Sequence, residues 1–460
     1  MRISGFLAPA LLAAIPFPAQ EPAEGALPVP EAVRAAVTAR MADGRIPGMA
    51  IGRISGKDVL RITEGKRNAQ KPDPVTPSTV FEIGSITKAF TGILLADMVL
   101  KGEVALDDPV SRYLPAGSTV PELNGTAITL RHLTTHTSGL PRLPDNMEPA
   151  DFDDPYADYD SARLLAFLAK HTLRRAPGAM YEYSNLGAGL LGWALANRAG
   201  LPYGELVRRR ILAPLGMLHS AVLETEAMRG ELALGHDFMG VPTKAWHLDV
   251  LAGAGALRST LDDMLRFAGA ARDTLKGPLA RVMALSQREL FRVDSVTSLG
   301  FGWHRRTRGG HTTVWHNGGT GGFRTMLVVD AGRGQAGVVL SNSAHGSDAL
   351  GMMLLDATVP IPPLPALRPT VAVDAPTLRR YLGRYVLAPT FVITITARDS
   401  TGIDLQATSQ PKFRLFASSP VDFFLTGVEA SITFETDAAG NVTALVLHQN
   451  GRDQRAPRAP

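Results

Sequence analysis

The sequence predicts an α+β fold, in which helices flank an antiparallel sheet, an all-helical subdomain lies beside it, and a small antiparallel β-barrel follows. Two observations lead to this prediction. Strand-like segments occur at both ends of the longer N-terminal part, with mostly helical patterns between them, which indicates one sheet completed by distant segments. After a proline-rich stretch, apolar residues alternate with a period of two, which is typical of strands.

The composition is that of a soluble globular protein and excludes several classes of function. Of the 460 residues, 45% are hydrophobic and 20% are charged, and 47 basic against 43 acidic residues give a net charge of +4. This bias is too weak to predict nucleic-acid binding. The absence of cysteine excludes disulfides, thiolate catalysis and cysteine-based metal centres. No paired-histidine zinc motif occurs, so we expect neither a metal nor a cofactor.

The N-terminal segment has the pattern of a secretory signal. After one basic residue, an apolar run from Ile3 to Ile15 is too short to span a bilayer but suits a signal peptide. We therefore predict a signal in residues 1–19, with cleavage near Ala19, and a periplasmic or secreted protein. The alternative is a buried N-terminal helix, which Pro9 and Pro16 disfavour. We expect no stable membrane span.

The first domain is predicted to cover residues 26–358. A helix begins at Pro30, because apolar side chains recur at helical spacing up to Met41, and it ends before Gly44. The elements predicted after it are a hairpin of strands 49–54 and 59–63, a helix that follows Ile83-Gly84 and stops at Gly102, helices 161–171 and 186–199 within a mostly helical region, and strands 312–315, 324–329 and 336–341.

A linker and a barrel are predicted to complete the chain. Residues 359–369 are rich in proline and predict an extended, semi-rigid linker. Within residues 370–456, alternating strand-like segments start at Phe391, Asp404, Asp422, Ser431 and Val442, which predicts the barrel. Small eight-stranded barrels often have filled interiors. We therefore expect the barrel to cover a cleft or to mediate homo-oligomer assembly, rather than to carry lipid.

The segment FEIGSITKAF contains a candidate nucleophile. Ser85 and Lys88 lie three residues apart at the start of a predicted helix, so their side chains share one face. A partly buried lysine loses its proton easily and can take one from a serine hydroxyl. The pattern alone is weak, because a second S-x-x-K occurs at Ser409–Lys412. That copy contains Pro411 and begins no helix.

Tyr183 and Asn185 belong to the only Y-x-N in the sequence and lie in a turn before a predicted helix. There a tyrosine hydroxyl can relay protons in a cleft, and the asparagine can contact a substrate amide. Taken alone, the motif would rather indicate a core tyrosine and a helix-capping asparagine.

The stretch VWHNGGTGGF supplies the third candidate element. His316 and Gly318 form the only H-x-G, and a glycine-bearing edge strand would let the backbone N–H of Gly319 face Ser85 as an oxyanion donor. A phosphate-binding loop is excluded, since the G-x-x-x-x-G-K-[ST] pattern is missing and the glycines lead into a strand.

These three motifs, in this order, resemble the serine β-lactamase and penicillin-binding superfamily. The resemblance is to its class C-like branch, which includes family VIII esterases and D-amino-acid peptidases, and it extends from about Val33 to Asp356. The supporting segments are His136-Thr-Ser-Gly-Leu-Pro141, Gly253-Ala-Gly-Ala-Leu-Arg-Ser-Thr260 and Phe301-Gly-Trp303. The final region resembles the lipocalin-like barrel that follows many bacterial members.

The resemblance implies that Ser85 is the acylated nucleophile and Lys88 its base. It further implies that Tyr183 shares proton transfer and deprotonates the hydrolytic water, while Asn185 holds the substrate amide. The substrate would be a small molecule: a β-lactam, a D-amino-acid peptide or a short ester. His316 replaces the lysine of class C β-lactamases, and a histidine is mostly neutral at neutral pH. We therefore expect hydrolysis of esters or peptides to the same degree as hydrolysis of β-lactams.

Two other functions remain open. One is a non-catalytic or slowly deacylating envelope protein that binds penicillin or peptidoglycan peptides. The other is an α/β-hydrolase esterase, which is disfavoured because no G-x-S-x-G motif occurs.

Overall fold

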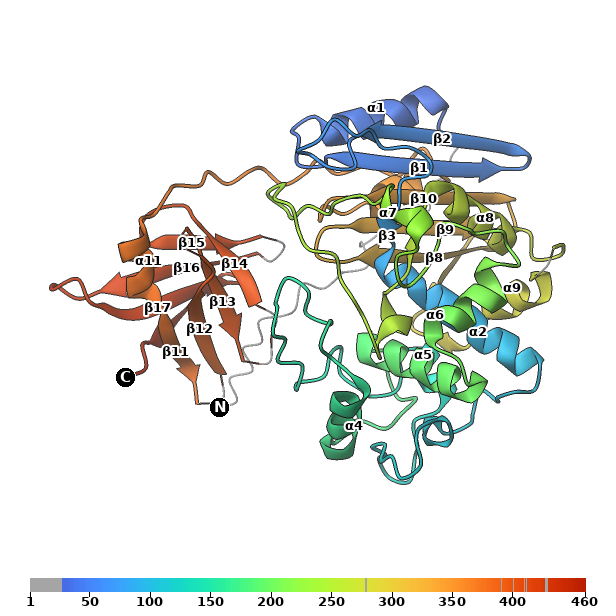
Figure 1. Ribbon diagram of the computed structural model, residues 1–460, viewed down its shortest axis with the longest axis horizontal. Helices are drawn as coiled ribbons and strands as arrows, with labels where there is room; N and C mark the ends of the chain where they lie inside the picture. Colours follow the sequence, from blue (N-terminus) through green and yellow to red (C-terminus); the bar gives the residue numbers. More distant parts are fainter. Residues whose placement is uncertain are drawn as a thin grey trace. The chain divides into compact units, whose positions relative to one another are not determined.

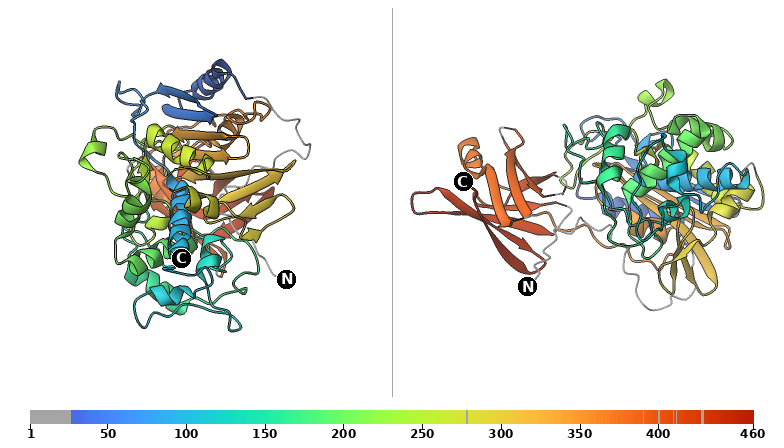
Figure 2. Two further views of the ribbon diagram at one scale, coloured as in Figure 1. Left: turned by 90° about the vertical axis from the view of Figure 1, so that its right-hand side faces the viewer. Right: turned by 90° about the horizontal axis from the view of Figure 1, so that it is seen from below.

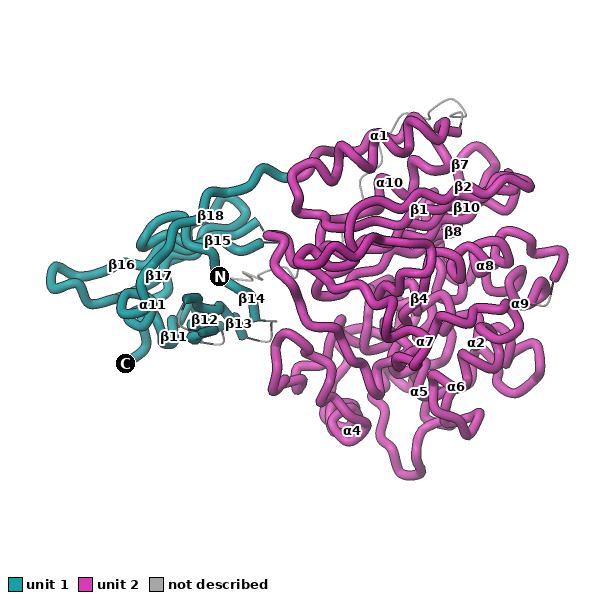
Figure 3. Tube along the Cα trace, turned by 45° about the horizontal axis from the view of Figure 1, so that its top comes forward, with its two compact units in different colours: residues 1–20, 365–460 teal, residues 21–364 magenta. Residues whose placement is uncertain are grey.

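The computed structural model describes residues 27–460 except 278, 390, 400, 409, 411, 427 and 428. The predicted signal peptide, residues 1–19, lies outside the described residues. Figure 3 colours two compact units, one that ends at Leu364 and one that begins at Pro365. None of the helices in the described ranges is long and apolar enough to cross a membrane.

The N-terminal unit is built around an antiparallel sheet of eight strands. Their order is β2 (Asp58–Gly65), β1 (Gly48–Ser55), β10 (Gln335–Ser341), β9 (Arg324–Asp330), β8 (His311–Gly319), β7 (His304–Arg308), β6 (Thr297–Leu299) and β5 (Phe291–Arg292). Ile51 of β1 pairs with Val339 of β10. The first hairpin, near the start of the unit's sequence, therefore completes a sheet whose other strands come from the end of that sequence (Figure 1). This confirms the prediction of one sheet made from distant segments. Strands β5 to β7 were not predicted, and because they extend the sheet beyond β8, the prediction that the strand of Gly318 is an edge strand was wrong.

Both faces of the sheet are buried at its central strands β9 and β10, where alternate residues point to different helices. Met326 and Val328 of β9 belong to the core under α1 (Pro30–Met41) and α10 (Asp348–Met353). Leu327 and Val329 belong to the larger core on the other face, where α2 (Thr87–Leu100) and α8 (Leu261–Arg272) pack. The strand period of two therefore divides apolar side chains between two helical layers.

The helical region between the two parts of the sheet is confirmed. It contains η2 (Val110–Tyr113), α3 (Leu130–Thr134), α4 (Ser161–Lys170), α5 (Asn185–Ala199), α6 (Tyr203–Val207), the π-helical turn η3 (Arg208–Leu212) and α7 (Glu226–Arg229). Three shorter elements surround the start of α2: β3 (Phe81–Glu82), η1 (Gly84–Ile86) and β4 (Arg258–Ser259). The remaining helical elements are η4 (Ala252–Ala254) and α9 (Ala280–Ser286).

The C-terminal unit is a nearly closed antiparallel barrel of eight strands, as predicted (Figure 2). After α11 (Ala375–Tyr381), the strands follow in sequence order: β11 (Gly383–Ala388), β12 (Phe391–Ala397), β13 (Ile403–Ala407), β14 (Lys412–Ala417), β15 (Asp422–Leu425), β16 (Ala430–Thr436), β17 (Val442–Gln449) and β18 (Arg452–Pro457). A bridge between Tyr385 and Arg458 links the first and last strands. The core of the barrel includes the buried side chains of Tyr385, Ile393 and Phe434.

Candidate active site

Ser85 lies in the single turn of η1, directly before α2. The preceding strand β3 pairs with β4, where Phe81 faces Ser259, and this pairing fixes the entry to the helix. Gly84 has φ of 51°, a backbone conformation that favours glycine. The side chain of Ser85 is 9% exposed, so its hydroxyl lies in a nearly closed site.

The amine of Lys88 is buried among polar groups. Its Nζ lies 3.0 Å from Ser85 Oγ, 2.9 Å from Asn185 Oδ1 and 2.6 Å from the carbonyl oxygen of Ala254. Burial lowers the pKa of Lys88 well below its usual value, and the nearby charge of Arg142 lowers it further.

These three contacts suit a neutral amine. A neutral amine has two N–H donors and one lone pair. The oxygens of Asn185 and Ala254 accept hydrogen bonds, whereas the hydroxyl of Ser85 can also donate one. With both N–H groups directed to the two carbonyl oxygens, the lone pair of Lys88 faces the proton of Ser85. This arrangement is suited to removing that proton.

The loop that carries Tyr183 and leads to Asn185, the first residue of α5, is held by the segment that begins at His136. The backbone N–H of Ser184 donates to Nδ1 of His136 at 3.1 Å, and the N–H of Glu182 donates to the carbonyl of His136 at 2.8 Å. Ser184, not Asn185, caps α5, by accepting from the N–H of Gly187. The side chain of Asn185 is thereby available to Lys88.

The phenol of Tyr183 lies between several cationic or ionisable groups. Its ring centroid is 4.9 Å from Nζ of Lys88 and 5.1 Å from Cζ of Arg142. Burial raises the pKa of Tyr183 well above its usual value, although a hydrogen bond with Ser85 opposes the rise. The phenol is therefore protonated at neutral pH and can pass a proton between neighbours.

His316 of β8 presents a neutral imidazole to the site. Its Nδ1 lies 2.6 Å from the carbonyl oxygen of Asn317, which places a proton on Nδ1. Its Nε2 is buried and has no hydrogen-bond partner among the described residues. Burial lowers the pKa of His316 well below its usual value, and His304 and Lys88 lower it further. The imidazole therefore carries no fixed positive charge.

Gly318 and Gly319 bring the backbone of β8 against η1. A Cβ on Gly318 would lie 2.0 Å from the carbonyl oxygen of Ile83, and a Cβ on Gly84 would lie 2.6 Å from the backbone nitrogen of Gly319. The hydroxyl of Thr325 donates to the carbonyl of Ile83 at 2.9 Å and joins the neighbouring strand to the same turn. The other six predicted site residues thus lie around Ser85.

Glycines in the supporting segments permit equally close packing around α2 and α5. A Cβ on Gly302 would lie 2.1 Å from the carbonyl oxygen of Lys88, and a Cβ on Gly192 would lie 2.8 Å from Cα of Gly253. The second contact places η4, with the carbonyl of Ala254, beside α5. Any side chain at these glycines would displace the partners of Lys88.

Two neighbours of the site were missed by sequence reasoning. Arg142 directly follows the supporting segment that ends at Pro141, and His304 directly follows the one that ends at Trp303. Their places beside these segments are the sequence signal by which both residues could have been found. The imidazole of His304 stacks on Trp315 with ring centroids 4.5 Å apart and lies 5.1 Å from His316. Burial lowers the pKa of His304 to about 4.

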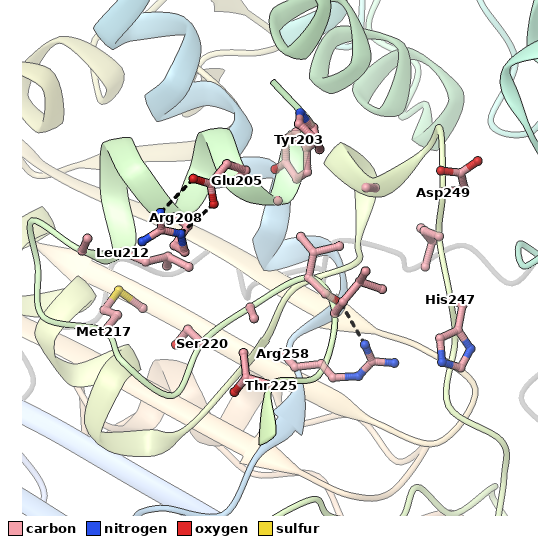
Figure 4. Close-up of a pocket in the computed structure, with 18 of the residues that line it drawn as sticks. Tyr203, Glu205, Arg208, Leu212, Met217, Ser220, Thr225, His247, Asp249 and Arg258 are labelled. Carbon is pink, nitrogen blue, oxygen red and sulfur yellow. Dashed lines mark hydrogen bonds and ion pairs between the residues drawn. The ribbon is translucent and has the colours of Figure 1, made fainter. Parts of the chain in front are cut away.

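A separate cavity of about 560 Å³ lies between α6, η3 and the segments around residues 217–225 and 247–252. Figure 4 shows Tyr203, Glu205, Arg208 and Arg258 on its wall. None of the seven predicted site residues lines it. Its wall is linked to the surroundings of the site, because the hydroxyl of Tyr203 contacts that of Thr91, which donates to the carbonyl of Gly253.

No group of three or more histidine, aspartate or glutamate side chains in the described ranges could hold a metal ion. The acidic loop of residues 145–160 forms ion pairs instead. Asp151 pairs with Lys244, and Asp154 pairs with His247.

The sequence is similar to families of known proteins. A family model described as Beta-lactamase matches residues 33–359, and a second, a domain of unknown function (DUF3471), matches residues 367–457. A beta-lactamase of Escherichia coli (strain K12) is 33% identical over 238 residues, covering 51% of this chain and 59% of that protein. Penicillin-binding protein 4* of Bacillus subtilis (strain 168) is 25% identical over 421 residues, covering 84% and 89%.

A third relative is the D-alanyl-D-alanine-carboxypeptidase/endopeptidase AmpH of Escherichia coli (strain K12). It is 39% identical over 171 residues, which cover 37% of this chain and 44% of AmpH. The match therefore spans less than two thirds of both Escherichia coli relatives.

Proposed function

Because the chain belongs to the β-lactamase family, we propose that it is a serine acyl hydrolase that cleaves an amide, β-lactam or ester bond through an acyl-enzyme on Ser85. The observation that carries this proposal is the 3.0 Å distance between Nζ of Lys88 and Oγ of Ser85. A buried amine with a lowered pKa at this distance is a competent general base at neutral pH.

In the acylation step, Oγ of Ser85 forms a bond with the carbonyl carbon of the substrate and loses its proton to Nζ of Lys88. The charge that develops on the carbonyl oxygen would be stabilised by the backbone N–H groups of Ser85 and Gly319. The proton then passes through the phenol of Tyr183 to the leaving group as the acyl bond breaks. The close packing of Gly84 on Gly319 supports this oxyanion site.

Deacylation needs a base for the attacking water. The resemblance implies that Tyr183 deprotonates this water, but its raised pKa disfavours a free phenolate. We therefore assign the net base role to the neutral amine of Lys88, with Tyr183 giving up its proton to Lys88 as it takes one from the water. The proton finally returns to Oγ of Ser85 as the acyl–oxygen bond breaks.

The neutral state of His316 bears on the choice of substrate. A lysine at this position would place a permanent positive charge beside the substrate, and His316 does not. The function therefore includes esters and D-amino-acid peptides alongside β-lactams. For its place of action we propose the periplasm or the cell exterior, as the N-terminal segment predicts.

The proposal is tested with Ser85→Ala and two substrates, a chromogenic cephalosporin and a short 4-nitrophenyl ester. The variant should lose turnover of every substrate that the wild type hydrolyses. Hydrolysis of both at the wild-type rate would refute the proposal. The second candidate, a slowly deacylating penicillin-binding protein, is favoured if intact-mass measurement shows a persistent penicilloyl adduct that is absent from Ser85→Ala.

For the barrel we propose a structural role, in assembly rather than in carrying a hydrophobic ligand. Its core is filled by buried side chains such as Tyr385, Ile393 and Phe434, which leaves little room for a lipid. A chain that ends at Leu364 should form an assembly with fewer subunits than the full chain, and it should retain ester hydrolysis. An unchanged number of subunits would contradict the assembly role.

A further inference from the structure

The guanidinium of Arg142 lies beside the candidate active site and has no partner of opposite charge in the part of the chain that the structure describes. Among the described residues, no carboxylate or carbonyl oxygen forms an ion pair or hydrogen bond with its side chain. Its side chain is only partly buried. The guanidinium makes a cation–π contact with Tyr183, whose ring centroid lies 5.1 Å from Cζ of Arg142. A guanidinium in such a place can bind a carboxylate of a ligand through two hydrogen bonds.

The other ionisable groups around Tyr183 do not compensate for this charge. Burial lowers the pKa of Lys88, His136, His304 and His316, which disfavours the charged form of each of them. Arg324, which lies near Gly319, already donates to the carbonyl oxygens of Thr320 and Phe323. Arg324 also interacts with the carboxylate of Asp348, whereas no carboxylate among the described residues is paired with Arg142.

We propose that the guanidinium of Arg142 binds an anionic group on the acyl part of the substrate, so that this protein acts on acyl compounds that carry a carboxylate. The inference rests on the proposed function. Arg142 would supply, from the loop before α4, the cation that His316 does not supply from β8.

The acyl side is favoured by the position of Arg142 next to Asn185. The backbone carbonyl of Arg142 accepts from the N–H groups of Asn185 and Leu186, at 3.0 and 3.1 Å. The resemblance implies that Asn185 holds the substrate amide, and we take this amide to be one in the acyl part. The guanidinium therefore belongs to the same side of the site as that amide, and a planar guanidinium matches a carboxylate with two hydrogen bonds.

The test compares three chromogenic esters that differ in the presence and the position of a carboxylate. One is neutral (4-nitrophenyl butyrate), one carries a carboxylate on the acyl part (mono-4-nitrophenyl glutarate), and one carries it on the leaving group (3-carboxy-4-nitrophenyl butyrate). The readout is the ratio of kcat/KM for each anionic ester to that for the neutral ester. The wild type should favour the glutarate, and Arg142→Gln should lower that ratio by about 10- to 100-fold.

Three further variants sharpen the test. Arg142→Lys keeps the charge without the two-pronged geometry and should lose part of the preference, whereas Arg142→Glu should disfavour the glutarate relative to the neutral ester. Arg174→Gln removes one positive charge from an exposed position and serves as the matched control. Tryptophan fluorescence verifies folding in each case, because all four tryptophans belong to the N-terminal unit.

The outcomes separate this inference from the proposed function. A glutarate ratio that stays within twofold of the wild type in both Arg142→Gln and Arg142→Glu would overturn the role of Arg142. A wild type without preference for the glutarate would do the same. If Arg142→Gln lowers the kcat/KM ratio only for the ester with the carboxylate on its leaving group, the assignment of Arg142 to the acyl part of the substrate would be overturned. Failure of the proposed function is seen independently, as hydrolysis of all three esters by Ser85→Ala at the wild-type rate.

Discussion

Gly318 packs so closely against Ile83 that a side-chain carbon at Gly318 would lie 2.0 Å from the carbonyl oxygen of Ile83. This approach holds β8 against the turn that carries Ser85, and so sets the distance between the nucleophile and the backbone N–H of Gly319. Gly318 has no unusual φ, so the glycine is required by space alone.

We therefore predict that Gly318→Ala lowers kcat by about 10²-fold, because a shift of about 1 Å in the oxyanion donor is enough for such a loss. The free energy of unfolding should fall by about 1–3 kcal/mol from overpacking. The control is Gly230→Ala, since a Cβ at Gly230 meets no atom within 4 Å. Ester kinetics and urea unfolding measure both effects, and equal kinetics for the two variants would contradict the prediction.

The buried amine of Lys88 should make the stability of the N-terminal unit depend on pH. The pKa of Lys88 is lowered well below 10.5 in the folded state, whereas the unfolded chain binds a proton at about 10.5. Between those two values the unfolded state holds more protons, so stability rises with pH. Relative to Lys88→Met, the wild type should gain up to about 1.4 kcal/mol for each pH unit between pH 7.5 and 9.5.

Urea unfolding followed by tryptophan fluorescence reports this unit alone, because all four tryptophans lie in it. The difference between wild type and Lys88→Met is compared at the two pH values, so that other titrating groups cancel. An exposed lysine substituted in the same way, Lys244→Met, is the control. A difference that does not change with pH would mean that Lys88 is charged in the folded protein.

Much of this architecture could be predicted from the sequence, because it depends on local patterns. The helix after Gly84, the first hairpin and the three strands 312–315, 324–329 and 336–341 all correspond to observed elements, although β8 extends to Gly319. Strands β5 to β7 were missed because they are short, carry many polar residues and occupy the edge of the sheet, where one side is solvated.

The candidate site was predicted through its motifs, but its charges were not. The pattern of Ser85, Lys88 and Tyr183 is local, whereas the lowered pKa of Lys88 depends on burial by η4 and α5, which lie far away in the chain. Similarly, nothing in the sequence shows that Arg142 lacks a partner, because an ion pair depends on tertiary contacts. The capping of α5 by Ser184 instead of Asn185 was equally hidden.

Tyr183 should matter more for turnover than for binding. Its phenol is hydrogen-bonded to Ser85 and stays protonated, so it can relay a proton in both acylation and deacylation. Tyr183→Phe keeps the ring contacts with Lys88 and Arg142 while it removes that relay. We expect kcat to fall by about 10²- to 10⁴-fold, with a small change in KM. An equal loss in Tyr181→Phe, whose ring lies beside His136, would assign the effect to packing.

His304 should make the N-terminal unit sensitive to acid. Burial lowers its pKa to about 4, while an unfolded histidine titrates near 6.5. As the pH falls from about 6.5 to 4, the unfolded chain takes up a proton that the folded chain does not. Stability is therefore lost over this range, by about 2–3 kcal/mol for this one group. Above pH 7 both states are neutral and the cost disappears.

His304→Phe should remove this loss, because phenylalanine does not titrate and can keep the stacking that His304 makes on Trp315, where the ring centroids are 4.5 Å apart. The free energy of unfolding of the variant should match that of the wild type within about 1 kcal/mol at pH 7.5. At pH 4.5 it should be higher than that of the wild type. His219→Asn, at an exposed position, is the control and should leave the acid dependence as it is. If wild type and His304→Phe lose stability in parallel between pH 7.5 and 4.5, another buried group, such as His316 or His136, carries the acid sensitivity.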